Sequence, residues 1–360
     1  MHPSKIQLAL LVAALLTGAA NAETKFGDHV TLKGFGTIGA VVTDTNEAQL
    51  RRTANQASGA DKDVDFGVDS RLGMQATAKW NDIFSLTGQV LVERSAYKPA
   101  NLEWLYGEAK LPAGFTVKLG RMVLPTFMVS DSRSVGYAAH WLRAPQEVYA
   151  VYPVSSFDGG QLMARHAFGP VNLTAQVSLG STKTKIGLYG RIGELKVDDI
   201  QSVNLLMESG DWLVRLGRTS ADATFNGVPL PALTDHFTGL GVQYDNGKAI
   251  VMAEYVTRRV DSAVGGVIDS DMWYASAGWR FGSLTPYVTA SKRKPTGSNA
   301  SRITDSTSAI GLRWDAMNDI AVKAQWQRTK GSVMFVNATP AFAATAPGVN
   351  ALSLAVDFVF

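Results

Sequence analysis

The side chains that could carry out chemistry are few in this sequence, and their spacing fits no known catalytic or metal-binding motif. The five histidines are scattered, and no two have the spacing of metal ligands. Cysteine is absent, which excludes disulfides and thiolate metal sites. The segment Gly187–Gly193 has a glycine at every third position, but no helix is expected after it to complete a phosphate-binding loop. We therefore expect no metal site, no cofactor and no enzymatic activity.

A serine–histidine pair is the one catalytic arrangement that remains to be weighed. His166 follows Ser155 and Ser156 in the sequence, and a serine nucleophile needs a histidine and a further polar group that orients it. The strand pattern described below supplies no such trio. The sequence therefore argues against a hydrolase.

The ionisable residues instead alternate with apolar residues, most clearly at the C-terminus. Between Ala351 and Phe360, every second residue is large and apolar, and the residues between are small, acidic or medium-sized. A period of two predicts a β-strand with two unlike faces. Such a terminal strand would aggregate in a soluble protein, whereas it can close a transmembrane β-barrel by pairing with the first strand. A strand of a soluble sandwich is the alternative.

Sixteen alternating runs of this kind follow one another along the chain. They are expected at residues 29–42, 65–79, 83–94, 102–111, 115–121, 156–168, 171–180, 199–208, 212–218, 236–245, 248–259, 271–281, 284–292, 305–314, 320–328 and 351–360. Short turns, such as Asn246-Gly247, alternate with longer connections, which is typical of bacterial outer-membrane barrels. We therefore predict an all-β fold, a sixteen-stranded antiparallel transmembrane β-barrel.

Residues 1–22 are expected to form a signal peptide and residues 23–360 the barrel. Lys5 precedes the mostly apolar run Ile6–Leu16, and Ala20-Asn21-Ala22 supplies small residues for cleavage near Ala22. Without Lys5, 33 basic residues stand against 31 acidic ones. This near balance argues against a nucleic-acid partner.

Tryptophans cluster near the ends of the expected strands, many of them beside a turn. An indole ring is favoured at the membrane interface because its ring is apolar and its N–H remains hydrated. We predict that five aromatic residues lie at this interface: Trp80, Trp212, Trp279, Trp314 and Phe360. The alternative is that some of these tryptophans pack in a core or in a subunit contact.

The chain resembles the sixteen-stranded general porins of Gram-negative outer membranes. The resemblance is carried by the small residues at the cleavage site, the step Gly120-Arg121, the stretches Leu124–Asp131 and Trp141–Tyr149, and the terminal Phe360. It implies an outer-membrane homotrimer that contacts lipid and lipopolysaccharide and is inserted by the barrel-assembly machinery through Phe360. It also implies that the third loop, residues 122–155, folds back as a constriction. The acidic Pro-Glu-Phe-Gly tip of enterobacterial porins is replaced here by Leu124-Pro125-Thr126-Phe127.

Inward-facing charges follow from the strand phase, if the polar face lines the lumen. The basic set is Arg71, Lys79, Lys110, Lys118, Arg121, Arg165, Arg215, Arg258, Arg280, Arg313 and Lys323. The acidic set is Asp65, Asp69, Glu93, Glu108, Glu254 and Asp357. This basic surplus predicts a mild preference for anions.

The pore-lining and constriction residues combine the wall charges with those of the third loop. We expect Arg71, Lys118, Arg121, Asp131, Arg133, Arg143, Glu147, Arg165, Arg215 and Arg313 to form this set. By the resemblance, Arg121 belongs to a ladder of arginines, with Arg71 and Arg165 as the next candidates and the acids Asp131 and Glu147 opposite. Several of these charges are alternatively structural salt bridges, and both roles can coexist.

The function expected from these features is a water-filled pore for passive diffusion of small hydrophilic solutes and ions. A solute-specific channel remains an alternative, because Tyr137, Trp141, Tyr149 and Tyr152 could form an aromatic path. A structural or adhesive barrel is another, with recognition loops at residues 43–64, 181–198 and 329–350.

Overall fold

The computed structural model describes residues 24–150, 152–188, 191–225, 228–261, 269–297 and 303–360. The expected signal peptide, residues 1–22, lies outside the described residues. Among the described residues, no helix has the length and apolar character needed to cross a membrane.

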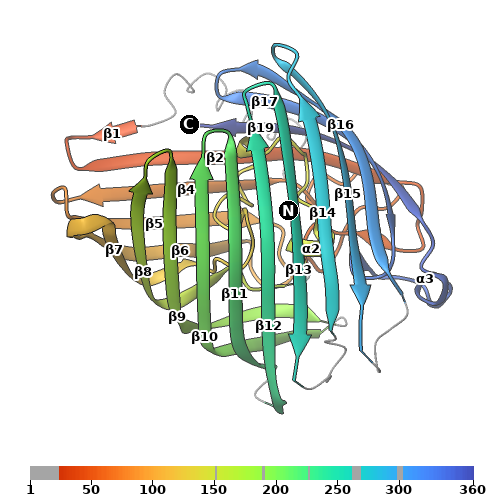
Figure 1. Ribbon diagram of the computed structural model, residues 1–360. Coiled ribbons are helices and arrows are strands. Elements are labelled where there is room, and N and C mark those ends of the chain that lie inside the picture. Colours follow the sequence, from red (N-terminus) through yellow and green to blue (C-terminus); the bar gives the residue numbers. More distant parts are fainter. Residues whose placement is uncertain (1–23, 151, 189–190, 226–227, 262–268, 298–302) are drawn as a thin grey trace.

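Sixteen long strands form one closed antiparallel barrel, as the sequence predicts (Figure 1). They are β2 (Val30–Thr43), β4 (Arg71–Lys79), β5 (Phe84–Glu93), β6 (Ala100–Lys110), β7 (Phe115–Val123), β8 (Ser156–Phe168), β9 (Val171–Leu188), β10 (Arg191–Ser209), β11 (Trp212–Phe225), β12 (Val228–Asp245), β13 (Ala249–Val260), β14 (Ser270–Trp279), β15 (Leu284–Pro295), β16 (Asp305–Met317), β17 (Ile320–Lys330) and β19 (Val349–Val359). Each pairs with the next along the chain, and β19 pairs with β2 to close the ring.

Short elements complete the described structure. The strand β1 (Thr24–Phe26) pairs with β2, and β3 (Gln49–Leu50) pairs with β18 (Phe335–Val336) between two loops. The helices are η1 (Pro112–Gly114), η2 (Gly136–Ala138), α2 (Gln146–Tyr149) and α3 (Pro340–Thr345).

The last strand has the two unlike faces that its sequence predicts. Leu352 and Leu354 are more than half exposed on the outside of the barrel. Ser353, Ala355 and Asp357 are buried on the other face, toward the lumen. The alternation therefore places apolar groups on lipid and polar or small groups inside.

The secondary structure predicted for two segments is wrong. The strand expected from Asp65 begins only at Arg71, because the Asp65 carboxylate accepts hydrogen bonds from the backbone N–H groups of Gly67 and Val68 and turns the chain. The loop expected at 181–198 is mostly sheet, since β9 and β10 pair up to Leu188 and Arg191. That segment is therefore not a free recognition loop.

The two ends of the sheet meet at a glycine. The backbone N–H of Phe360 donates to the Gly34 carbonyl (2.9 Å), and the Gly34 N–H donates in return (2.6 Å). A Cβ at Gly34 would lie 2.1 Å from the Phe360 ring, so only glycine lets the ring lie across the neighbouring strand.

A second glycine shapes the wall where the long third loop leaves it. Gly120 on β7 has φ +128°, a conformation that side chains disfavour. A Cβ there would lie 2.3 Å from the Leu105 carbonyl oxygen of β6, which is backbone and cannot turn away. Gly120 therefore allows β7 to pair closely with β6 just before the chain turns inward.

We predict that Gly120→Ala destabilises the barrel by at least about 1–3 kcal/mol, from overpacking and backbone strain. Gly107→Ala on β6 is the matched control, because a Cβ there meets nothing within 4 Å. The measurement is the urea midpoint of unfolding of the refolded proteins. Equal midpoints for the two variants would contradict the packing described here.

Candidate functional site

The connection between β7 and β8, residues 124–155, folds into the barrel and is called the inserted loop below (Figure 1). Its helix α2 packs against β14, β15 and β16, and η2 packs against β2 and β19. The loop therefore crosses the lumen and contacts wall strands far apart around the ring. The 16-stranded barrel is wide enough for an aqueous channel, which this segment narrows.

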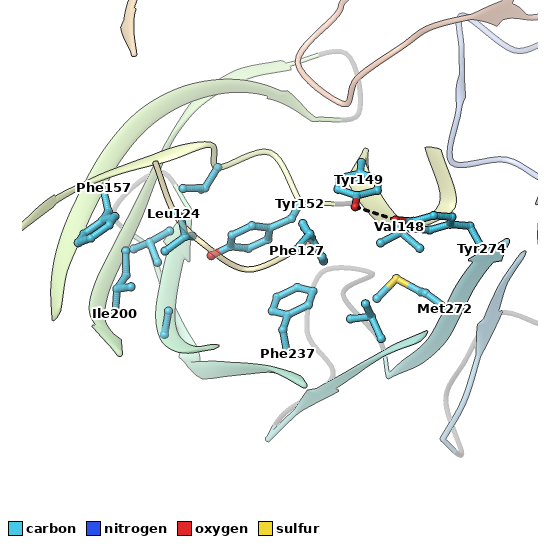
Figure 2. Packing of buried hydrophobic residues seen from close by; sticks show 14 of the residues in the cluster. Leu124, Phe127, Val148, Tyr149, Tyr152, Phe157, Ile200, Phe237, Met272 and Tyr274 are labelled. Atoms are coloured by element: carbon cyan, nitrogen blue, oxygen red, sulfur yellow. Dashed lines mark hydrogen bonds between the residues drawn. The ribbon is translucent and has the colours of Figure 1, made fainter. Parts of the chain in front are cut away.

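Aromatic side chains hold one arm of the inserted loop against the wall. Figure 2 shows Phe127 and Tyr152 packed with Phe237 of β12, at ring-centre distances of 5.9 and 5.0 Å. Tyr149 lies against Phe127 and Tyr274 in the same cluster. These ring contacts, three of them edge-to-face and that of Tyr149 with Tyr274 tilted, fix the loop together with the apolar area that they bury.

The aromatic path considered for a solute-specific channel is therefore mostly buried. Trp141, Tyr149 and Tyr152 are 3–6% exposed, and Tyr137 alone of the four is half-buried. The Tyr137 hydroxyl donates to the Asn318 carbonyl, and its ring stacks with Arg313. These rings anchor the loop, and all four also border the cavity described below.

Arg215 lies beneath the inserted loop, which corrects its expected place on the pore surface. Its guanidinium donates to the carbonyl of Pro125 and to Asn204, and it is 3% exposed. The nearby Glu254 accepts hydrogen bonds from the Met128 N–H (2.9 Å) and the Tyr149 hydroxyl (2.7 Å). The strand phase is right, but the loop covers this part of the wall.

Arg143 binds the opposite side of the barrel through a buried ion pair. Its guanidinium contacts Asp69 at 2.5 Å and also donates to Gln327 and to Ser353 (2.9 Å). Burial opposes ionisation of Asp69, but the charge and hydrogen bonds of Arg143 outweigh it and hold the pKa of this carboxyl below its usual range. The ion pair ties the loop to the segment before β4.

Lys323 holds the middle of the inserted loop. Its ammonium donates to the carbonyls of Gly136 (2.7 Å) and Trp141 (2.9 Å) and pairs with Asp357 at 2.9 Å. The Thr37 hydroxyl donates to the same carboxylate. The lysine is fully buried and points inward as expected. Its positive charge is neutralised inside the fold by Asp357.

Glu147 does not face the arginines, which corrects the expected constriction pair. It is 1% exposed and accepts hydrogen bonds from the hydroxyls of Ser291 and Thr307 (2.6 Å) on β15 and β16. Burial without a contacting cation raises the pKa of Glu147. Its stabilising contribution is therefore full below the ordinary glutamate pKa and is lost as pH rises through the raised value.

His140 docks the loop against β14. Its Nε2 lies 2.7 Å from the Ser276 hydroxyl, and the ring packs edge-on against Tyr287. Burial, followed by the positive charges of Lys323 and Arg280, lowers the pKa of His140 to about 3. The imidazole is thus neutral at neutral pH.

One cavity of about 730 Å³ runs beside the inserted loop. Its lining includes Lys98 and Lys183 near the long loops and Asp245 and Arg280 near the short turns, so it spans the barrel from end to end. Five expected pore residues line it: Arg71, Arg121, Arg133, Arg143 and Arg313. The structure thus brings the arginines of the loop and the wall to one passage.

The other expected pore residues lie elsewhere. Lys118 pairs with Glu108 at 3.5 Å and is not among the lining residues. Arg165 pairs with Glu208 at 2.9 Å, close to the short turn after β8. Asp131 is exposed and borders a smaller pocket beside Arg133.

Five cavity arginines each contact a carboxylate. The pairs are Arg52–Glu93, Arg121–Asp158, Arg143–Asp69, Arg280–Asp245 and Arg313–Asp315. Arg52 was missed because it lies in a stretch without periodicity, where strand phase gives no signal. The sequence does not single out Asp158 and Asp245, because they lie near strand ends. There, the register of the barrel decides which side of the sheet a side chain faces.

The serine–histidine arrangement does not form. The Ser155 hydroxyl donates to Glu103 (3.0 Å), whereas His166 packs against Phe168. Ser156 and His166 are ten residues apart along the extended β8, or about 33 Å. The described residues also contain no group of three or more histidine or acidic side chains arranged to hold a metal ion.

A sequence model of the Gram-negative porin family matches residues 9–351. The chain belongs to this family. It is therefore an outer-membrane channel protein. No curated protein sequence matches the chain significantly.

Solved structures share the fold of this porin at low sequence identity. Salmonella typhi OmpF, in complex with daunomycin, has a TM-score of 0.64 and 12% identity, covering 94% of this chain and 100% of its own. The anion-selective porin from Comamonas acidovorans has a TM-score of 0.62 and 15% identity, covering 92% and 99%. The trimer form of Vibrio cholerae OmpT has a TM-score of 0.60 and 13% identity, covering 92% and 100%.

We predict that Asp69→Asn destabilises the porin by about 3–5 kcal/mol, because Arg143 would stay buried without its charge partner. The loosened loop should also give larger current fluctuations in single channels. Asp158→Asn is the control: it removes a more exposed ion pair, whose loss costs at most about 1 kcal/mol. Urea midpoints that fall equally in both variants would contradict a special role for the buried pair.

The pH dependence of stability tests the docking of His140. Since its pKa falls from 6.5 in water to about 3 in the fold, the unfolded chain binds more protons between these values. Stability should therefore fall as pH drops below 6.5, by up to about 1.4 kcal/mol per pH unit. His140→Asn should show a weaker loss between pH 7 and pH 4, whereas the exposed His166→Asn should follow the wild type. Identical pH profiles for all three proteins would refute this assignment.

Proposed function

We propose that this porin forms a channel with a mild preference for anions and lets small hydrophilic solutes diffuse passively. The observation that carries the proposal is the charge of the cavity lining. Its basic members are Arg52, Arg71, Lys98, Arg121, Arg133, Arg143, Lys183, Lys185, Arg280 and Arg313. Its acidic members are Glu93, Glu103, Glu194, Asp245 and Asp315. Fixed positive charge in a narrow passage raises the local concentration of anions.

The two alternatives have less support. A solute-specific channel has less support, because three of the four candidate rings that border the cavity are nearly buried. A mainly adhesive barrel needs free outer loops, but loops 43–64 and 329–350 pack together through β3, β18 and a shared apolar cluster around Leu50, Phe335 and Phe342. A channel with fixed outer loops agrees better with these contacts.

The outer surface of the barrel indicates which membrane components the proposed channel would contact. Trp80, Trp212, Trp279 and Trp314 are 47–63% exposed and lie near the short turns, which supports an aromatic belt at that interface. The outer ends of the same wall would meet lipopolysaccharide. The apolar outer face, including Leu352 and Leu354, would meet lipid.

Assembly is also part of the proposal. One fold relative, Vibrio cholerae OmpT, has a trimer form, and we propose a homotrimer for this chain as well. Phe360 at the seam would be the residue through which the barrel-assembly machinery acts, since it pairs the last strand with the first. Cleavage of the signal peptide near Ala22 would precede β1, which begins at Thr24.

We predict stepwise openings in planar bilayers. In a tenfold KCl gradient, the sign of the reversal potential should indicate anion selectivity, and its magnitude should be below the ideal value of about 59 mV. The surplus of basic groups in the lining is the reason for the sign. A potential of cation sign would overturn the anion preference. Bilayers that stay silent with folded protein would support the adhesive alternative.

A further inference from the structure

The basic residues of the cavity differ in how far their charge is cancelled. Five arginines lie against carboxylates, as described above. Within the described part of the chain, no carboxylate lies within 4.0 Å of Arg71, Lys98, Arg133 or Lys183. The uncancelled positive charge of the passage is therefore concentrated on these four side chains and on Lys185, whose ammonium lies against the Tyr97 ring.

Arg71 is hydrogen-bonded to the inserted loop one residue away from Arg133, and both arginines line the cavity. Arg71 Nε donates to the Ser134 carbonyl (2.6 Å) and Nη1 to the Asp69 carbonyl (2.9 Å), so backbone acceptors hold the group, which is 7% exposed. The acids Asp357, Asp69 and Glu93 act on it at longer range, and each of them is paired with another cation. Arg133 directly precedes Ser134, and no hydrogen bond or ion pair of its side chain occurs within the described residues. Two guanidinium groups with free N–H donors thus border the same passage.

The acids nearest to Arg133 are engaged elsewhere. Arg133 interacts at longer range with Glu103 and Glu93. Glu103 accepts the Ser155 hydroxyl (3.0 Å), and Glu93 pairs with Arg52. Neither carboxylate occupies the donors of Arg133, which remain available to a solute.

The basic side chains without a contacting carboxylate are also unevenly distributed along the channel. Lys98 lies in the loop before β6 and Lys183 near the outer end of β9, both on the side of the long loops. At the short turns, Arg280 and Arg313 are paired with Asp245 and Asp315. Anions arriving from the long-loop side therefore meet uncancelled charge first.

We propose that Arg71 and Arg133 bind small divalent oxyanions of the phosphate type inside the channel and that Lys98 and Lys183 collect them from the long-loop side. Planar guanidinium groups match oxygen pairs on one central atom, and two cations on the same passage favour a divalent over a monovalent anion. The inference rests on the proposed anion preference and names the solute class that the passage holds longest.

Inorganic phosphate is the probe. We expect it to reduce the single-channel chloride current in a saturable way, with faster block when phosphate is added on the long-loop side. Arg133→Gln should raise the half-blocking phosphate concentration about tenfold, because charge-assisted hydrogen bonds are lost. Because Arg133 makes no contact that the fold needs, this variant should fold normally.

Two further variants complete the test. Arg133→Lys should keep part of the block, since it retains the charge but loses the planar fork. Arg165→Gln removes an arginine outside the cavity lining and should leave the half-blocking concentration unchanged. Lys98→Gln with Lys183→Gln should slow block from the long-loop side alone.

The outcomes separate this inference from the proposed function. A wild-type channel that prefers chloride but shows no saturable phosphate block would overturn the oxyanion site and leave the anion preference standing. Unchanged block in Arg133→Gln would do the same. A wild-type channel that prefers potassium would overturn both.

Discussion

The structure depends on one constraint: within a bilayer, every backbone N–H and C=O must find a partner in the protein. A sheet meets this requirement only when its first and last strands pair, here β2 with β19. The paired backbone groups of Gly34 and Phe360 extend that ladder to the last residue. The closed ring of sixteen strands encloses a lumen too wide for wall side chains to fill, so a further segment of chain must occupy it.

The inserted loop occupies this lumen and is held by charges as much as by apolar packing. Arg143, Arg215 and Lys323 are nearly or fully buried, and each reaches a carboxylate or a loop carbonyl. Burying ions is costly, and hydrophobic residues of similar size would often stabilise a fold equally well. Directional bonds to particular carbonyls, however, specify one position of the loop, and the width of a channel depends on that position.

The charged side chains of this porin therefore have two different roles. Most of the inward-pointing ones are neutralised in contacts such as Lys323–Asp357, which fix the loop and add little to the field in the passage. A smaller set, exemplified by Arg133, keeps its charge beside the cavity. In the proposed channel this smaller set would govern selectivity, because a cation in contact with a carboxylate contributes mainly a dipole at longer range.

The fold class and the number of strands could be read from the alternation of apolar and polar residues. Alternation such as that of Leu352, Ser353 and Leu354 is local, and each residue reports the face on which it lies. The resemblance carried by Gly120-Arg121 and the long connection that follows implied an inserted third loop, but the sequence left open whether that segment enters the lumen. Where local hydrogen bonds interrupt the pattern, as at Asp65, the strand boundary could not be read from alternation.

Which charges border the passage depends on how the inserted loop folds across the lumen. Arg215 and Arg71 have the same strand phase toward the lumen, yet the loop covers Arg215 with Pro125 and leaves Arg71 on the passage. Glu147 was expected in the constriction and instead accepts hydroxyl groups of two distant strands. Strand phase tells whether a side chain points inward, but its partner depends on how the loop crosses the lumen. That path is set by contacts between residues far apart in the sequence, 90 positions for Arg215 and Pro125 and 144 for Glu147 and Ser291.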